Sequence, residues 1–176
     1  YPQHQIVLTH MTPTGRTAGK ELFGDKVLQS YLPYDYADAV EKFLAHFKPQ
    51  AGIIMETEIW PNLFTACKEK NIPLILVNAR LSQKSALRYG YAKPLVGETL
   101  SCLHHIAAQT EGDAQRLRQL GAKNISVCGN MKFDVAVPDE MLERGNRLRT
   151  LFGSRPVFLA ASTRDGEETQ LFDYIE

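Results

Sequence analysis

Short apolar segments alternate with helical patterns along most of the chain. Most of the apolar segments are continuous rather than alternating, which is typical of strands in a parallel sheet that is buried on both faces. Strands that alternate with helices favour an α/β doubly wound fold, a Rossmann-like parallel sheet with right-handed crossovers. The predicted strands cover residues 5–9, 26–31, 51–55, 73–78, 105–109, 125–128 and 156–161.

Helix signals lie between these strands. The clearest predicted helix covers residues 36–47, whose apolar residues recur along one stripe. A second begins at Pro61, because proline suits the first helical position, where its missing N–H costs no hydrogen bond. A third covers residues 111–120, with acids in its first turn, arginines later and Gly121 as its end signal.

The pattern changes after residue 134. Residues 1–134 are predicted to form one Rossmann-like domain, and residues 135–155 a linker followed by a polar helix. Residues 156–176 are predicted to begin a second α/β domain, with its first strand and part of its first helix. The chain starts at Tyr1 without a methionine and stops within a predicted helix, so we expect sequence to be missing at both ends.

Composition narrows the classes of protein. The 176-residue chain is 44% hydrophobic and 23% charged, which suits a packed domain and argues against wholesale disorder. Lys and Arg total 20, as do Asp and Glu, so the formal net charge is zero and no nucleic-acid partner is expected. The three cysteines form no CxxC pair, which favours neither a zinc site nor a disulfide framework. No apolar run approaches the roughly 18 residues that a membrane span needs.

The most informative polar segment, residues 55–62, follows a predicted strand and precedes a helix. It brings two carboxylates, Glu56 and Glu58, together with the only tryptophan, Trp60. In open α/β sheets the ligand crevice lies outside the carboxyl ends of the strands, so these groups suit a binding site. Capping of the next helix by Thr57 or Glu58 is the alternative interpretation, and the spacing leaves both open.

Three further polar segments follow predicted strands. Arg80 suits a phosphate or carboxylate, with an ion pair to a nearby acid as the alternative. Lys132, which follows Gly129, is a point charge suited to an anionic ligand, with a solvated lysine as the alternative. Residues 161–168 offer hydroxyls and free N–H groups to an anion, with helix capping as the alternative. Because all four segments follow strands, we expect them to meet at one edge of the sheet and form a ligand crevice.

In order and spacing, six segments resemble the 3-deoxy-D-manno-octulosonic acid (Kdo) transferases of lipopolysaccharide synthesis. The resemblance covers essentially the whole chain, and its most specific strings are METEIWPN, NARLS and GNMKFD. Ile59, Met131 and Arg164 stand where the family usually has Leu, Leu and His, which leaves any contact of that histidine open. The resembling segments are residues 12–15, 31–35, 55–62, 78–82, 129–134 and 161–168.

The resemblance implies a GT-B glycosyltransferase, with two Rossmann-like domains and the active site between them. It implies inverting transfer of Kdo from the donor CMP-Kdo to a lipid A precursor, without a metal or other cofactor. The family's general base is a glutamate upstream of the matched region, with no counterpart in this chain. Glu58 and Lys132 match residues regarded in the family as transition-state stabilisers. The implied substrate-binding residues are Arg80, Asn130, Ser162, Thr163, Gly166 and Glu167.

For the full-length protein, the resemblance implies contact with a membrane surface, at the cytoplasmic face of the bacterial inner membrane. This chain alone is expected to be inactive, because the base and most of the donor-binding domain are missing from it. Two alternatives stay open, namely another GT-B sugar-nucleotide enzyme and a non-catalytic sugar- or lipid-binding domain. A nicotinamide-dependent enzyme is disfavoured because no GxGxxG string follows a strand. Residues 15–20 superficially resemble a phosphate loop, but their spacing is one residue short.

Overall fold

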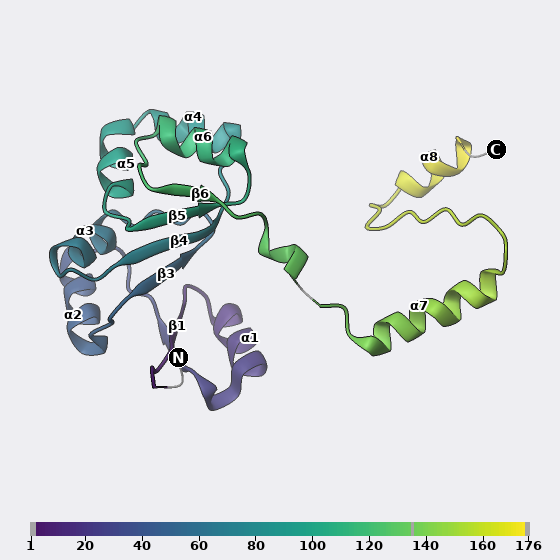
Figure 1. Cartoon of the computed structure of the whole chain (residues 1–176), viewed down its shortest axis with the longest axis horizontal. Helices are drawn as coiled ribbons and strands as arrows, with labels where there is room; N and C mark the ends of the chain where they lie inside the picture. The colour runs from purple at the N-terminus through teal and green to yellow at the C-terminus, as the bar shows by residue number, and fades with distance from the viewer. Residues whose placement is uncertain (1–2, 135, 175–176) are drawn as a thin grey trace. The chain divides into compact units, whose positions relative to one another are not determined.

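The computed structural model describes residues 3–134 and 136–174, and the chain divides into two compact units (Figure 1). The first unit is Tyr1–Phe133 and the second is Asp134–Glu176. Parallel strands and helices alternate along the first unit, so the predicted α/β class with a parallel sheet is confirmed. Within the described ranges, no helix combines the length and the apolar character needed to cross a membrane.

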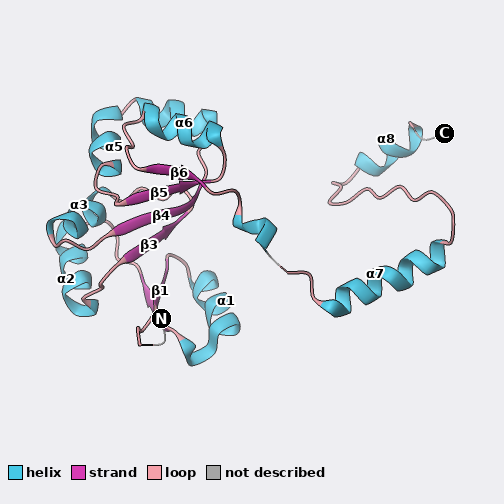
Figure 2. Cartoon of the chain, in the orientation of Figure 1, coloured by secondary structure: helices cyan, strands magenta, loops and turns pink. Residues whose placement is uncertain are grey.

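The first unit carries all the strands of the described chain (Figure 2). Its elements, up to the short 3-10 turn at the boundary, are β1 (Val7–His10), α1 (Pro13–Phe23), η1 (Gly24–Lys26), β2 (Leu28–Tyr31), α2 (Ala37–Phe47), β3 (Gly52–Met55), α3 (Pro61–Glu69), β4 (Leu74–Ala79), α4 (Gln83–Gly90), α5 (Lys93–Leu100), β5 (His105–Ala108), α6 (Glu111–Gln119), β6 (Ile125–Val127) and η2 (Met131–Asp134).

The described residues form two parallel sheets. β1 pairs with β2, and β3, β4, β5 and β6 form a second sheet in that order. Each strand of the second sheet lies beside the next strand along the chain, with Gly52 opposite Leu74 and Ile106 opposite Ile125. Because all four strands are parallel, their carboxyl ends meet at one edge, and the segments that follow them leave the sheet there.

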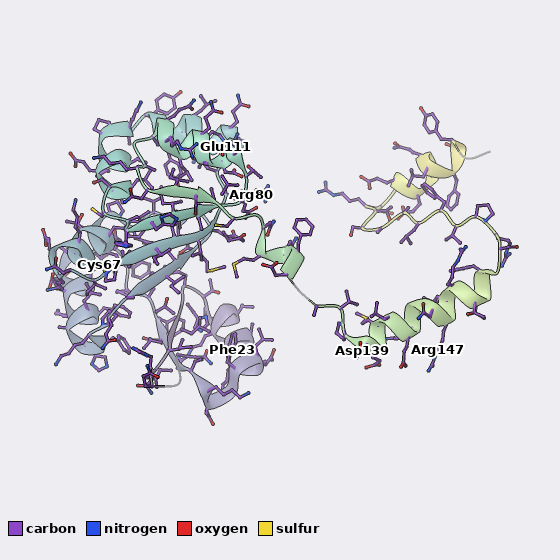
Figure 3. The ribbon with its side chains drawn as sticks, viewed as in Figure 1. Phe23, Cys67, Arg80, Glu111, Asp139 and Arg147 are labelled. Atoms are coloured by element: carbon purple, nitrogen blue, oxygen red, sulfur yellow. The ribbon has the colours of Figure 1, made fainter. Side chains whose placement is uncertain are left out.

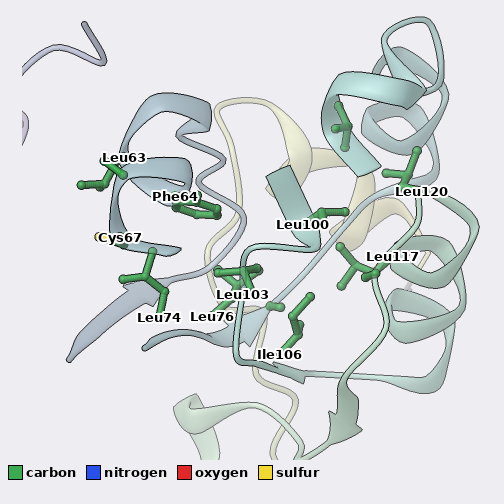
Figure 4. Packing of buried hydrophobic residues seen from close by; sticks show 14 of the residues in the cluster. Leu63, Phe64, Cys67, Leu74, Leu76, Leu100, Leu103, Ile106, Leu117 and Leu120 are labelled. Atoms are coloured by element: carbon green, nitrogen blue, oxygen red, sulfur yellow. The ribbon is translucent and has the colours of Figure 1, made fainter. Parts of the chain in front are cut away.

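The core of the first unit lies between this sheet and its helices (Figure 4). Phe64 on α3, Leu76 on β4 and Leu117 on α6 are fully buried, and Ile106 on β5 is nearly so. Burial of each such side chain contributes about 1.5–3 kcal/mol before entropy is counted. Burial also raises the pKa of the Cys67 thiol to about 11, so this cysteine stays a neutral core residue.

Six of the seven predicted strands are confirmed, but burial on both faces is not found everywhere. Along β3 the side chains alternate between half-buried and exposed, and Ile53 is 68% exposed. Only one face of β3 is therefore covered in the described part of the chain. The predicted helices at 36–47, 61 and 111–120 correspond to α2, α3 and α6.

The second unit contains α7 (Asp139–Phe152) and α8 (Glu167–Asp173). The predicted strand at 156–161 is wrong, because this segment has no strand pairing in the described residues. A strand exists only where its backbone N–H and C=O groups bond to a neighbouring strand, and apolar sequence alone does not supply that partner. Phe158 and Leu159 are accordingly 66% and 82% exposed.

Candidate functional site

Three of the four polar segments singled out in the sequence come together at the carboxyl edge of the β3–β6 sheet. They follow β3, β4 and β6, and Figure 3 shows Arg80 at this end of the sheet. The fourth segment, residues 161–168, belongs to the second unit and follows no strand. Its expected place beside the other three segments therefore stays a prediction.

A cavity of about 520 Å³ opens at this edge. Its volume lies within the range of roughly 300–1,000 Å³ that is usual for small-molecule sites. The cavity brings together Glu58 and Arg80, two residues singled out from the sequence, while Asn130 and Lys132 do not line it. The lining residues are Met55, Glu56, Thr57, Glu58, Arg80, Ser82 and Ser85.

The loop after β3 holds Glu58 at the cavity. Glu56 has a φ of +57°, a left-handed conformation that turns the chain sharply at the end of the strand. The hydroxyl of Thr57 donates to the carbonyl of Arg80, which ties this loop to the next one. The indole N–H of Trp60 donates to Glu58 Oε2 at 3.1 Å, while the Glu58 side chain remains exposed. A fixed, solvent-facing carboxylate of this kind is available to a ligand.

Helix capping does not explain Thr57 or Glu58. The N-cap residue of α3 is Trp60, which makes no side-chain capping bond. Asp35 fills this role from outside the helix, since its Oδ2 and Oδ1 accept the backbone N–H groups of Asn62 and Leu63, each at 2.9 Å. These bonds satisfy N–H groups that helical bonding leaves free.

Asp35 is a site residue that the local pattern did not reveal. The side-chain amide of Asn62 also donates to the Asp35 carbonyl at 2.6 Å, so the two residues hold each other in place. They are 27 positions apart, and helix-capping signals are read within a few residues. The latch between Asp35 and Asn62 anchors the start of α3, and with it the end of the loop that carries Glu58.

The loop after β4 presents Arg80. The alternative interpretation of this residue, an ion pair with a nearby acid, is not found in the described part of the chain, and its side chain is exposed. The hydroxyl of Ser82 accepts the N–H of Ser85 at 3.1 Å, so Ser82 caps α4. Arg80 is thus a cation on a well-anchored turn, a suitable partner for a carboxylate or phosphate.

The backbone of the same loop is clamped by two charged residues of α6. The N–H of Leu81 donates to Asp113 Oδ1 at 2.9 Å, and Arg116 Nε donates to the Leu81 carbonyl. Asp113 is 5% exposed and pairs with Arg116 at 3.0 Å. Both bonds to Leu81 span more than 30 positions of sequence.

Competing effects act on the Asp113 carboxyl. Burial by itself raises its pKa, but hydrogen bonds from Thr110 and from the Leu81 N–H, together with the Arg116 guanidinium, lower the pKa below its ordinary value. Asp113 therefore stays ionised at neutral pH. The buried charge is held by three donors, and the loop that carries Arg80 is attached to it.

The segment after β6 carries Asn130 and Lys132. Asn130 Oδ1 accepts the backbone N–H of Lys132 at 3.0 Å, and its carbonyl accepts the N–H of Phe133 at 3.0 Å. Asn130 therefore shapes the turn that presents Lys132. The Lys132 side chain is exposed, so the alternative of a solvated lysine stays open.

In the second unit, two groups that were expected to donate hydrogen bonds to an anionic ligand donate instead to carboxylates of the same unit. The Thr163 hydroxyl donates to Glu168, and this bond lowers the pKa of the Glu168 carboxyl. The N–H of Arg164 donates to Glu167 Oε2 at 2.9 Å. The Thr163 hydroxyl and the Arg164 N–H are thus already bonded in this structure.

The other expected residues of this segment shape its backbone. Ser162 and Gly166 have φ values of +61° and +88°. Gly166 is the N-cap residue of α8, and no side chain caps this helix. Capping by a hydroxyl, the alternative interpretation of the segment, is therefore not found.

The comparisons with known proteins decide the family. The sequence model of the family described as 3-Deoxy-D-manno-octulosonic-acid transferase (kdotransferase) matches residues 1–135. The chain belongs to the Kdo transferase family. The resemblance noted in its sequence is thereby confirmed, and the matched range ends two residues beyond the boundary of the first unit.

Relatives within this family extend the match through the second unit. The chain is 41% identical over 175 residues to 3-deoxy-D-manno-octulosonic acid transferase of Bordetella pertussis, covering 97% of the chain and 41% of that protein. It is 40% identical over 171 residues to the protein of the same name from Haemophilus influenzae, covering 96% of the chain and 40% of that protein. The chain thus spans about two fifths of the length of these curated relatives.

The relatives are not confined to bacteria. A protein of Arabidopsis thaliana named probable 3-deoxy-D-manno-octulosonic acid transferase, mitochondrial, is 35% identical over 170 residues, covering 93% of this chain and 38% of that protein.

In residues 3–134 and 136–174 of the Kdo transferase chain, no three His, Cys, Asp or Glu side chains gather as a metal-binding group.

Proposed function

We propose that this chain is part of a GT-B glycosyltransferase that moves Kdo from CMP-Kdo to a lipid A precursor. The proposed reaction inverts the anomeric centre and needs no metal. It takes place on a membrane-bound acceptor, at the cytoplasmic face of the bacterial inner membrane. The family membership of the chain and the names of its relatives support the transferred sugar.

One observation carries the proposal: the cavity at the carboxyl edge of the sheet holds a carboxylate, Glu58, and a guanidinium, Arg80. Kdo is an acid and CMP carries a phosphate, so a fixed cation beside the reacting sugar suits this donor. The sugar gains positive charge as the leaving group departs, and a fixed carboxylate stabilises that charge. Both charges are on anchored loops, which is how an enzyme avoids reorganisation during the reaction.

The proposed step is a single displacement. An acceptor hydroxyl attacks the anomeric carbon of Kdo, the new C–O bond forms, and the bond from that carbon to the phosphate oxygen breaks. The bonding electrons leave with CMP, and the hydroxyl proton passes to a general base, for which a glutamate upstream of this sequence is the proposed group. Glu58 stabilises positive charge on the sugar, and Lys132 offsets negative charge on the donor.

A transfer assay tests the proposal. A full-length protein that contains this sequence is incubated with CMP-Kdo and a lipid A precursor, and the product is analysed by mass spectrometry with and without a chelator. We expect the acceptor to gain the mass of Kdo in both conditions, with release of CMP. Turnover with a UDP-sugar but not with CMP-Kdo would indicate a different sugar-nucleotide enzyme, and binding without turnover would indicate a non-catalytic domain.

Trp60 offers an independent measure of donor binding. It is the only tryptophan of the chain, and its indole N–H contacts a lining residue of the cavity. We expect its fluorescence to change on titration with CMP-Kdo. The part of this change that Trp60→Phe abolishes reports binding at this site, and it separates loss of binding from loss of chemistry in the site's variants.

The charge of Lys132 gives a second prediction. We expect Lys132→Ala to lower kcat/KM far more than Lys132→Arg, because arginine keeps a cation near the donor. Loss of a charged hydrogen bond to a desolvated anion costs roughly 1.5–3 kcal/mol, which corresponds to about a ten- to hundredfold loss of rate. Lys123→Ala, at another exposed lysine, is the matched control. Equal and small effects of both Lys132 substitutions would place its ammonium group in solvent, away from the donor.

A further inference from the structure

Asn78 lies at an irregular position of β4. Its φ is +52°, in the left-handed region of backbone conformation that residues other than glycine, asparagine and aspartate rarely adopt. The pairing of β4 with β5 shifts register between Leu76 and Ala79, so Asn78 sits where the pairing is irregular, as at a β-bulge. Bulges beside functional sites redirect side chains, which makes the contacts of this residue informative.

The contacts of Asn78 join the ends of three neighbouring strands. Its carbonyl accepts the side-chain N–H of Gln109, which follows β5, at 3.0 Å. Its side-chain Oδ1 accepts the backbone N–H of Met131, which follows β6, at 3.3 Å. Met131 is 53 positions away from Asn78 in sequence and directly precedes Lys132.

The residue type matches both demands of this position. Glycine tolerates a φ of +52° but has no acceptor, whereas most other residues have neither the tolerance nor a short side chain that reaches Met131. Asparagine and aspartate satisfy both demands. An asparagine adds no negative charge at an edge of the sheet that presents Arg80 and Lys132.

We propose that Asn78 is a positioning residue, which holds the segment that carries Lys132 against the carboxyl edge of the sheet. It acts through the Met131 N–H and does not itself touch substrate. The consequence for catalysis rests on the proposed function, in which Lys132 faces the donor. The contact between Asn78 and Met131 does not depend on the proposed function. The contact and its consequence for catalysis are therefore tested by separate measurements.

The first measurement is amide exchange of Met131 in this chain, followed residue by residue by NMR. Asn78→Gly removes the acceptor and relieves the backbone, and we expect Met131 to exchange about two- to tenfold faster, the effect of losing one ordinary hydrogen bond. Asn78→Asp keeps an acceptor, so the Met131 exchange rate is expected to stay as in the wild type.

Asn71→Gly is the matched control. Asn71 also has a positive φ, +55°, but lies just after α3, away from Met131. We expect it to leave Met131 exchange unchanged. An unchanged rate in Asn78→Gly, or an equal acceleration in Asn78→Asp, overturns the positioning role.

The second measurement is a double-mutant cycle in a full-length protein that contains this sequence. Asn78→Gly is expected to lower kcat for Kdo transfer about tenfold or less in the wild-type background, and to have no further effect when Lys132→Ala is already present. Additive losses in the cycle would show that Asn78 does not act through Lys132. A wild-type protein that transfers no Kdo would refute the proposed function, while the exchange experiment would still decide the contact.

Discussion

Glu58→Gln is expected to remove most of the transfer activity of a full-length protein that contains this sequence, with a loss of about 10²- to 10³-fold in kcat. Glutamine keeps the shape of the side chain and an oxygen for the Trp60 indole N–H, which donates at 3.1 Å in the wild type. It lacks the negative charge that stabilises a positively charged sugar. The measurement is steady-state Kdo transfer, with the product quantified at saturating CMP-Kdo.

Thermal unfolding accompanies this assay, because Glu58 is exposed and its replacement is not expected to weaken the fold. Glu69→Gln, which removes an exposed carboxylate near the other end of α3, is the matched control and is expected to leave transfer unchanged. Near-wild-type transfer in Glu58→Gln, or a loss explained by a collapse of the melting temperature, would show that Glu58 has no role in the chemistry.

Asp113→Ala is expected to lower the free energy of unfolding of the first unit by about 3–5 kcal/mol, as when one partner of a buried ion pair is removed. The change leaves the Arg116 guanidinium without its carboxylate and the Leu81 N–H without its acceptor. It also removes the contact of the Thr110 hydroxyl at the start of α6. Denaturant unfolding followed by circular dichroism measures the loss.

The exposed pair of Asp38 and Lys42 provides the control. Its side chains are 77% and 82% exposed and lie 3.8 Å apart, so Asp38→Asn is expected to change stability by less than about 1 kcal/mol. A similarly small effect of Asp113→Ala would contradict the clamp on the Leu81 backbone. A stable variant with a loosened Arg80 loop would instead locate the effect in the loop alone.

The lowered pKa of Asp113 sets the pH dependence of this contribution. An aspartate in the unfolded chain titrates near its ordinary pKa of 3.8, and the folded-state pKa lies below it. The stabilisation is therefore fully present above about pH 4 and is lost as the pH falls through the folded-state pKa. The difference in unfolding free energy between wild type and Asp113→Asn is expected to be constant from pH 7 to about pH 5 and to shrink below pH 4. If the difference in unfolding free energy grew on acidification, the pKa of Asp113 would be raised by folding rather than lowered.

The strands of the first unit were predictable because parallel strands are continuous apolar runs bounded by polar turns. α1, α4 and α5 were not assigned from the sequence, although Thr12 and Ser82 cap the first two of these helices. α1 and α5 contain interior glycines, α4 is only eight residues long, and all three have few regularly spaced apolar residues, so the helical period was weak. The predicted strand at 156–161 failed for a different reason, since pairing depends on a partner that apolar sequence does not provide.

The sequence by itself determined the family, the α/β class and two of the charges that line the cavity. Glu58 and Arg80 lie in the segments that follow β3 and β4, and topology alone sends both to the same edge of a parallel sheet. Only the tertiary structure decided how those charges are held. Asp35, Asp113 and Asn78 make bonds across 27, 32 and 53 positions of sequence. Such bonds depend on which strands and helices become neighbours after folding, and no local spacing encodes that proximity.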